Sequence, residues 1–116
     1  MKKVYFAHAN EGDYENKFYK PLGSLKNIKF VFPYANEETK FSRDIIKKCD
    51  YLLADISNPA MGMGIEIGWA NAFGVPIIFM YKRGSKVSSY LSKLSKNIIE
   101  YRNLEKELYK IKEIII

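Results

Sequence analysis

Residues 50–82 of the chain read DYLLADISNPAMGMGIEIGWANAFGVPIIFMYK, and this segment decides the fold. Its continuous apolar run at 51–54 predicts a strand of a sheet that is covered on both faces. A helix is expected at about 64–73, because Gly74 lies where a helix C-cap is expected and a proline follows two residues later. Residues 75–81 predict the next strand. This order of strand, helix and strand is typical of a parallel sheet.

The rest of the chain continues the alternation. Further strands are expected at residues 4–7, 28–32 and 98–99. Helices are expected from Asp13 with an interruption at Pro21, over 39–49, around Val87, Leu91 and Leu94 with Ser85 or Ser88 as the cap, and from Leu104 onward. The alternation predicts βαβ units around a parallel sheet in one domain, residues 1–116. The apolar end 114–116 is expected to pack on the body or to meet a partner subunit.

Composition narrows the class of protein. A chain of 116 residues that is 47% apolar has enough material for one ordinary core and is unlike a disordered protein. Because it has no apolar run of 18 residues and no secretory leader pattern, a cytoplasmic location without membrane attachment is expected. Cys49 is the single cysteine and His8 the single histidine, which excludes an internal disulfide and a Cys/His zinc cluster.

The net charge of +6 raises the question of nucleic-acid binding. The 19 Lys and Arg residues are spread along the chain rather than gathered in a run, which is typical of a solvated surface. Nucleic acid is therefore not the expected partner. The charge would equally suit a small anionic substrate such as a nucleotide.

Ligands of open parallel sheets bind at the carboxyl ends of the strands. This rule selects four loops: residues 7–12, 33–38, 55–64 and 81–89. The third is the richest, because Asp55 ends its strand and Gly62 and Gly64 allow backbone to approach a ligand closely.

Glu66 follows that loop, in the expected first turn of the next helix. The positive end of the helix dipole would favour its ionised form there, and such a carboxylate suits nucleophilic attack on a sugar carbon. The alternative is that Glu66 is an ordinary acidic residue at a helix N-terminus. A dinucleotide site is disfavoured, because Ile67 replaces the third glycine of G-x-G-x-x-G and the segment follows the third strand.

Four segments together, VYFAHA (4–9), YLLADISNP (51–59), GMGIEIGWANAFGVPIIFMYK (62–82) and GSKVSSYL (84–91), resemble the nucleoside 2-deoxyribosyltransferase superfamily. The likeness is strongest to its small branch of 2'-deoxynucleoside 5'-phosphate N-hydrolases. The resemblance and the strand pattern imply an α/β, Rossmann-like (flavodoxin-type) three-layer sandwich. Its mostly parallel sheet would have about five strands, with helices on both faces.

The resemblance implies a role for several residues. Glu66 matches the glutamate that attacks C1' of deoxyribose and forms a covalent glycosyl-enzyme, and Tyr5 matches the first-strand tyrosine of that pocket. Asp44 is the candidate for the second carboxylate, although its spacing to Glu66 is about two residues shorter than in the hydrolase branch. Ser89 matches a serine that contacts the 5'-phosphate, often of a neighbouring subunit, and thereby implies a homodimer.

The substrate-binding residues expected from the loops are His8, Asp55, Ser57, Asn58, Met61, Gly62 and Gly64. Two departures from the family pattern should weaken binding of a 5'-phosphate. Ala60 replaces a serine of the hydrolase branch, and Glu11 replaces an arginine. No metal or cofactor is implied, because the 2'-deoxy sugar lacks the 2-hydroxyl that would destabilise the charge developing on its ring.

The expected activity is therefore cleavage of an N-glycosidic bond in a deoxynucleoside or its 5'-monophosphate. If water releases the sugar from the covalent glycosyl-enzyme, the protein is a hydrolase. If a second base takes up the sugar instead, the protein is a transferase, and the sequence leaves both open. A phosphoribohydrolase of the cytokinin-activating type is disfavoured, because the chain lacks P-G-G-x-G-T. A non-catalytic nucleotide-binding or TIR-like sensor module is the alternative from another class.

Overall fold

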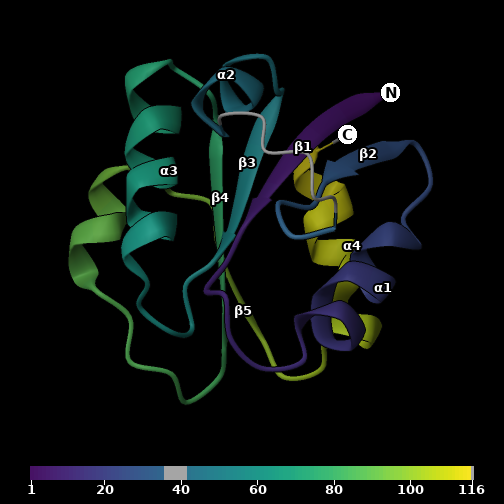
Figure 1. The fold of residues 1–116 in the computed structure, drawn as a ribbon. Helices are drawn as coiled ribbons and strands as arrows, with labels where there is room; N and C mark the ends of the chain where they lie inside the picture. The colour runs from purple at the N-terminus through teal and green to yellow at the C-terminus, as the bar shows by residue number, and fades with distance from the viewer. Residues whose placement is uncertain (36–41, 116) are drawn as a thin grey trace.

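The computed structural model describes residues 1–35 and 42–115 of the chain. One sheet of five parallel strands forms its centre, in the order β2-β1-β3-β4-β5 (Figure 1). The strands are β1 (Lys2–Ala7), β2 (Ile28–Val31), β3 (Tyr51–Asp55), β4 (Ile77–Lys82) and β5 (Ile98–Tyr101). This is the flavodoxin-type order, and it confirms the expected fold class.

Helical segments cover both faces of the sheet (Figure 1). They are η1 (Glu15–Tyr19), α1 (Lys20–Gly23), α2 (Ser42–Lys47), α3 (Met61–Ala72), η2 (Ser89–Lys93) and α4 (Leu104–Ile115). In Figure 1, α2 and α3 lie on one side of the sheet, and α1 and α4 lie on the other. Not one of the helices within the described ranges is long and apolar enough to cross a membrane.

Alternating side chains of the strands separate two cores. Tyr5 and Ala7 of β1 belong to the core under α2 and α3, whereas Val4 and Phe6 belong to the core under α1 and α4. β3 follows the same rule, because Leu52 and Leu53 are fully buried in opposite cores. The period of two that places side chains on alternate faces therefore fixes which functional residues share a face.

Several expected elements differ in detail. The interruption at Pro21 takes the form of a π-helical turn, η1, that passes directly into α1, with the Lys20 amide donating to the Glu15 carbonyl. Because Pro21 has no N–H to donate, a change of helix type at this point costs little. The segment around Leu91 is a 3-10 helix, and Ser88 caps it by accepting from the Tyr90 amide. Of the helix expected at 39–49, residues 39–41 lie outside the described residues.

The start of α3 corrects the sequence-based boundary. The helix begins at Met61 rather than near Gly64, and no acidic residue lies in its first turn. Glu66 is thus in the second turn, where the helix dipole no longer accounts for its ionisation. The end matches the expectation, because Gly74 follows with φ +71°.

The C-terminal helix packs on the body of the domain. Ile115 is 1% exposed and Ile114 is packed against the same core, under α1 and α4. Of the two expectations for the apolar end, packing on the body is therefore confirmed for these two residues. Ile116 lies outside the described residues.

Candidate active site

Tyr5 and Glu66 form the centre of the candidate site. β1 carries Tyr5, which is 1% exposed, and α3 carries Glu66 in a half-buried position. The Tyr5 hydroxyl donates a short hydrogen bond to Glu66 Oε2. Both side chains lie on the α3 face of the sheet, so the pair expected from the sequence is brought together by the parallel strand and its helix.

Ser42 is a third member of the cluster that the sequence analysis missed. It is the first residue of α2, and its Oγ lies 3.3 Å from the Tyr5 hydroxyl oxygen. Ser42 also hydrogen-bonds the Glu66 carboxylate. Because the single phenol proton of Tyr5 goes to Glu66, the Ser42 hydroxyl acts as the second donor to this group of oxygens.

Burial and hydrogen bonding act on Glu66 in opposite directions. Desolvation by burial raises the pKa of Glu66 above its ordinary value of 4.5, and this effect outweighs the lowering by the hydrogen bonds from Tyr5 and Ser42. Burial and the adjacent carboxylate also raise the pKa of Tyr5, so the phenol stays protonated and donates. The two hydroxyls thus favour an ionised carboxylate in a site whose burial opposes it.

Asp44 does not join this cluster. Its side chain is 67% exposed and its carboxylate lies 3.6 Å from the Arg43 guanidinium. Because α2 turns Asp44 outward, Ser42, which lies two residues earlier, reaches Tyr5 instead. The periodicity of a short helix separates these two residues, and the sequence alone did not specify which of them faces the sheet.

The residues at the start of α3 are more exposed than expected. Met61 was expected among the substrate-binding residues of a loop, but it is the first residue of α3 and is 85% exposed. Gly62 and Gly64 are exposed helical residues, and a Cβ placed on either would meet no heavy atom within 4 Å. Ser89 begins η2 and is also exposed.

A second polar cluster lies at the carboxyl edge on the other face of the sheet. The Tyr101 hydroxyl donates to Asp55 Oδ2 at 2.5 Å, and the Ser57 amide donates to Asp55 Oδ1 at 3.0 Å. Asp55 is 4% exposed and Tyr101 is 6% exposed. Burial and the Asp55 charge raise the pKa of Tyr101, so its phenol is a donor.

His8 lies on this second face within a group of aromatic rings. Its Nδ1 lies 2.7 Å from the Ala9 carbonyl, which can only accept, and its Nε2 lies 2.7 Å from the Tyr19 hydroxyl. The proton is therefore on Nδ1, and Tyr19 donates to Nε2. Burial lowers the pKa of His8, which keeps the ring neutral at pH 7.

A cavity of about 530 Å³ opens beside this second cluster. Four of the residues expected to bind substrate line it, namely His8, Asp55, Ser57 and Asn58. Tyr5, Ser42 and Glu66 are not among its lining residues. The structure thus divides the expected site residues between the two faces of the sheet. Within residues 1–35 and 42–115, no group of three or more His, Cys, Asp or Glu side chains could hold a metal ion.

Comparisons with known proteins give a partial sequence match and matches to solved structures. No protein-family model matches the chain. It is 38% identical over 48 residues, 40% of its length, to a Syntrophotalea carbinolica protein named "Putative 2'-deoxynucleoside 5'-phosphate N-hydrolase 1". The match spans about a third (34%) of that relative.

Solved structures match over nearly the whole chain. The Clostridium botulinum CMP N-glycosidase BcmB superposes with a TM-score of 0.68 at 25% identity, covering 99% of this chain and 100% of that one. A conserved protein from Enterococcus faecalis V583 gives a TM-score of 0.72 at 20% identity over 98% and 99% of the two chains, which is a likeness of fold alone. Together with the partial match, these findings confirm the resemblance to the nucleoside 2-deoxyribosyltransferase superfamily.

Proposed function

We propose that this protein is an enzyme that cleaves the N-glycosidic bond of 2'-deoxynucleosides or their 5'-monophosphates. The observation that carries the proposal is the Tyr5–Ser42–Glu66 cluster, in which two hydroxyls hold a half-buried carboxylate near the carboxyl edge of the sheet. The names of two similar proteins, an N-hydrolase and an N-glycosidase, support cleavage of the same type of bond.

Glu66 would act as the nucleophile. Its Oε2 accepts the Tyr5 hydrogen bond, which leaves Oε1 to attack the anomeric carbon. As the bond from oxygen to carbon forms, the bond from carbon to the base nitrogen breaks. The electron pair goes to the base, which takes up a proton from solvent. The product of this first step is a glycosyl ester of Glu66 and a free base.

A second step would release the sugar. Water attacks the anomeric carbon, its proton passes to solvent, and the Glu66 carboxylate leaves with the bonding electrons. If a second base attacks instead of water, a new nucleoside forms. In both cases Tyr5 and Ser42 again donate to the carboxylate as its negative charge returns, so the same two hydroxyls assist departure of the ester oxygen.

Replacing Glu66 tests the proposal. The parent protein should release free base from deoxynucleosides or deoxynucleoside 5'-monophosphates. Chromatography of the products measures this release. Glu66→Gln should lower the rate about 1,000-fold or more while the fold is retained by circular dichroism. No turnover by the parent protein on any of these substrates would overturn the enzyme proposal and favour a non-catalytic nucleotide-binding module.

Adding a free acceptor base to the same reaction separates transfer from hydrolysis. A new nucleoside in the product mixture indicates transfer, and sugar alone indicates hydrolysis. Mass spectrometry of the denatured protein after rapid quenching should detect Glu66 carrying the sugar residue.

A homodimer is part of the proposal. Met61 and Ile65, one turn apart on α3, are 85% and 49% exposed, and Tyr90 of η2 is 63% exposed. A second copy would cover these apolar side chains. Light scattering after size-exclusion chromatography should show a dimer that Ile65→Lys converts to monomer, and a monomeric parent protein would overturn this part.

A further inference from the structure

We infer that the cavity beside Asp55 is a second ligand site, separate from Glu66, for a neutral, hydroxyl-rich small molecule the size of a free sugar. The inference does not depend on the reaction proposed above. It rests on the organisation of the cavity floor, on the balance of charges around it and on its position on the opposite face of the sheet.

The floor is a continuous relay of hydrogen bonds. The Lys82 amide donates to Ser57 Oγ at 2.9 Å, and Ser57 hydrogen-bonds Tyr101, whose hydroxyl donates to Asp55. The relay joins β4, the loop after β3, β5 and β3 itself. Donors and acceptors arranged in a chain strengthen one another and orient the last acceptor, which is the Asp55 carboxylate.

Asp55 has acceptor capacity that the relay does not use. A carboxylate offers about four acceptor sites, and the hydrogen bonds from the Ser57 amide and the Tyr101 hydroxyl occupy one on each oxygen. Because Asp55 lines the cavity, its free lone pairs are available to a ligand there. A carboxylate that is 4% exposed is costly to bury, and donors from a ligand would offset part of that cost.

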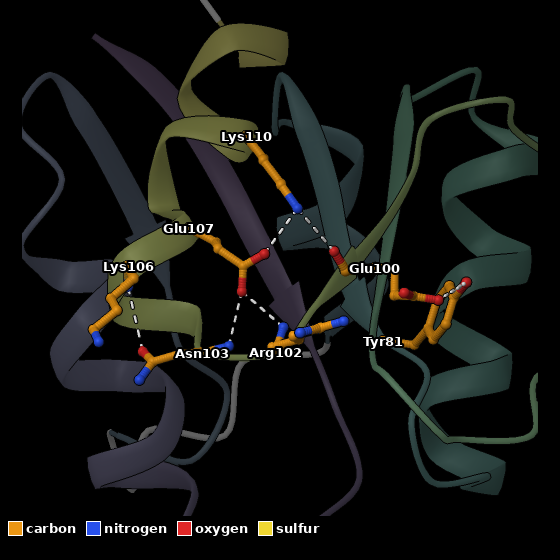
Figure 2. Close-up of polar contacts among 7 residues, drawn as sticks. All are labelled: Tyr81, Glu100, Arg102, Asn103, Lys106, Glu107 and Lys110. Carbon is orange, nitrogen blue, oxygen red and sulfur yellow. Dashed lines mark hydrogen bonds and ion pairs between the residues drawn. The ribbon is translucent and has the colours of Figure 1, made fainter.

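The rim is held in place by the start of α4. The Glu107 carboxylate accepts from the amides of Arg102 and Asn103 at 2.7 and 2.8 Å, and it pairs with Lys110 at 2.8 Å (Figure 2). Lys110 also donates to the Glu100 carbonyl. These bonds fix the loop between β5 and α4. Arg102 and Asn103 are therefore held in place at the rim of the cavity before a ligand binds.

Formal charges around the cavity cancel. Its lining includes three cations, Lys17, Lys82 and Arg102, and three carboxylates, Glu11, Asp55 and Glu105, while burial keeps His8 neutral. A phosphate site in a protein of net charge +6 would be expected to gather an excess of cations. Instead the buried Asp55 repels an anion at the floor, so a neutral ligand fits better than a phosphate ester.

The remaining lining suits hydroxyl groups. Three amide side chains and two serines, Asn16, Asn58, Asn103, Ser57 and Ser85, alternate with an apolar wall that includes Phe18, Pro21 and Leu104. Amides and serines both donate and accept, as sugar hydroxyls do, and the apolar wall can contact the C–H face of a sugar ring. The volume of about 530 Å³ is within the range of small-molecule sites.

The test is a titration of the full chain with D-ribose, in which NMR measures the amide chemical shifts at each sugar concentration. We expect saturable shifts at Ser57, Ser85 and Tyr101, with a dissociation constant on the order of 1 mM for a ligand of this size. D-Ribose 5-phosphate, the charged comparison, should bind no more tightly than D-ribose. Asp55→Asn should weaken D-ribose binding about tenfold or more, because it replaces one acceptor oxygen by a donor.

Two further variants keep the test decisive if Asp55→Asn does not fold. Ser85→Trp places a large ring in the cavity from its wall and should abolish the shifts, whereas Glu66→Gln should leave them unchanged. The inference is overturned if D-ribose causes no saturable shift up to about 50 mM. It is equally overturned if the shifts centre on Ser42 and Glu66, or if the phosphate ester binds about tenfold tighter.

Discussion

The Tyr5 hydroxyl donates to Glu66 Oε2 between β1 and α3, across 61 positions of the sequence. This bond joins the first strand of the chain to the helix that follows the third strand. Ser42 of α2 contributes a further hydroxyl, whose Oγ is within hydrogen-bond distance of the Tyr5 hydroxyl.

Ser42→Ala should shift the pH dependence of base release. Glu66 must be ionised to attack, and the Ser42 hydrogen bond lowers its pKa. Without that bond the pKa of Glu66 rises further, so the acid limb of kcat/KM moves to higher pH, and the rate at neutral pH falls about fivefold. Ser42→Thr keeps a hydroxyl and should restore the parent profile. An unchanged acid limb in Ser42→Ala would contradict this role.

Glu66→Gln should stabilise the protein at neutral pH. Burial raises the folded-state pKa of Glu66 above 4.5, so the protonated form is favoured in the native state. Stability from this group is present below pH 4.5 and is lost as the pH rises through the raised value. The neutral amide avoids that loss and can still accept from Tyr5. Thermal melts should therefore show a higher Tm for the variant at pH 8 and a smaller difference at pH 4.

Asp44→Asn should have little effect on turnover. The side chain is 67% exposed and its ion pair with Arg43 is a surface contact of small energetic value. We expect kcat/KM within about twofold of the parent, in contrast to Ser42→Ala, which is the matched comparison on the same helix. A loss comparable to that of Glu66→Gln would show that Asp44 acts in the reaction, as the family resemblance implies.

Leu53→Ala should destabilise the whole domain. Leu53 lies at the centre of β3 and is fully buried in the core shared with α1 and α4. Removing its side chain leaves a cavity that costs about 2–5 kcal/mol, or roughly 10–20 °C in Tm. Urea unfolding measures the free energy directly. Lys86→Ala, a change of an exposed residue in the loop after β4, should cost less than about 0.5 kcal/mol and serves as the control.

The strands could be predicted well because each contains an apolar run bounded by turn residues. All five expected strands are present, and Gly74 ends α3 where its conformational freedom was expected. The start of α3 could not be predicted in the same way. Glycines at 62 and 64 are typical of a loop, yet these residues are helical in the structure. Because α3 begins earlier than expected, Glu66 lies in its second turn rather than its first.

The candidate site was predicted in part. Tyr5 and Glu66 followed from the resemblance, and the structure brings them together. Ser42 could not be found, because a lone serine has no sequence signal of function and Asp44 offered the expected carboxylate. The orientation of a six-residue helix decides between them, and this depends on the packing of α2 against α3. The bond between Tyr101 and Asp55 likewise depends on the parallel pairing of β3, β4 and β5.

The sequence by itself determined the class of fold, because apolar periodicity and turn residues are local properties that neighbours in the chain share. Glu66 was proposed as the nucleophile from the family resemblance, and that role stays a prediction. Tertiary structure alone decided which hydroxyls surround Glu66 and which polar residues lie on the opposite face. The physical reason is that side chains alternate across each strand, so residues from distant segments meet according to strand order and register. Glu66 and Asp55, eleven positions apart in the same loop-and-helix segment, thereby belong to different faces of the sheet.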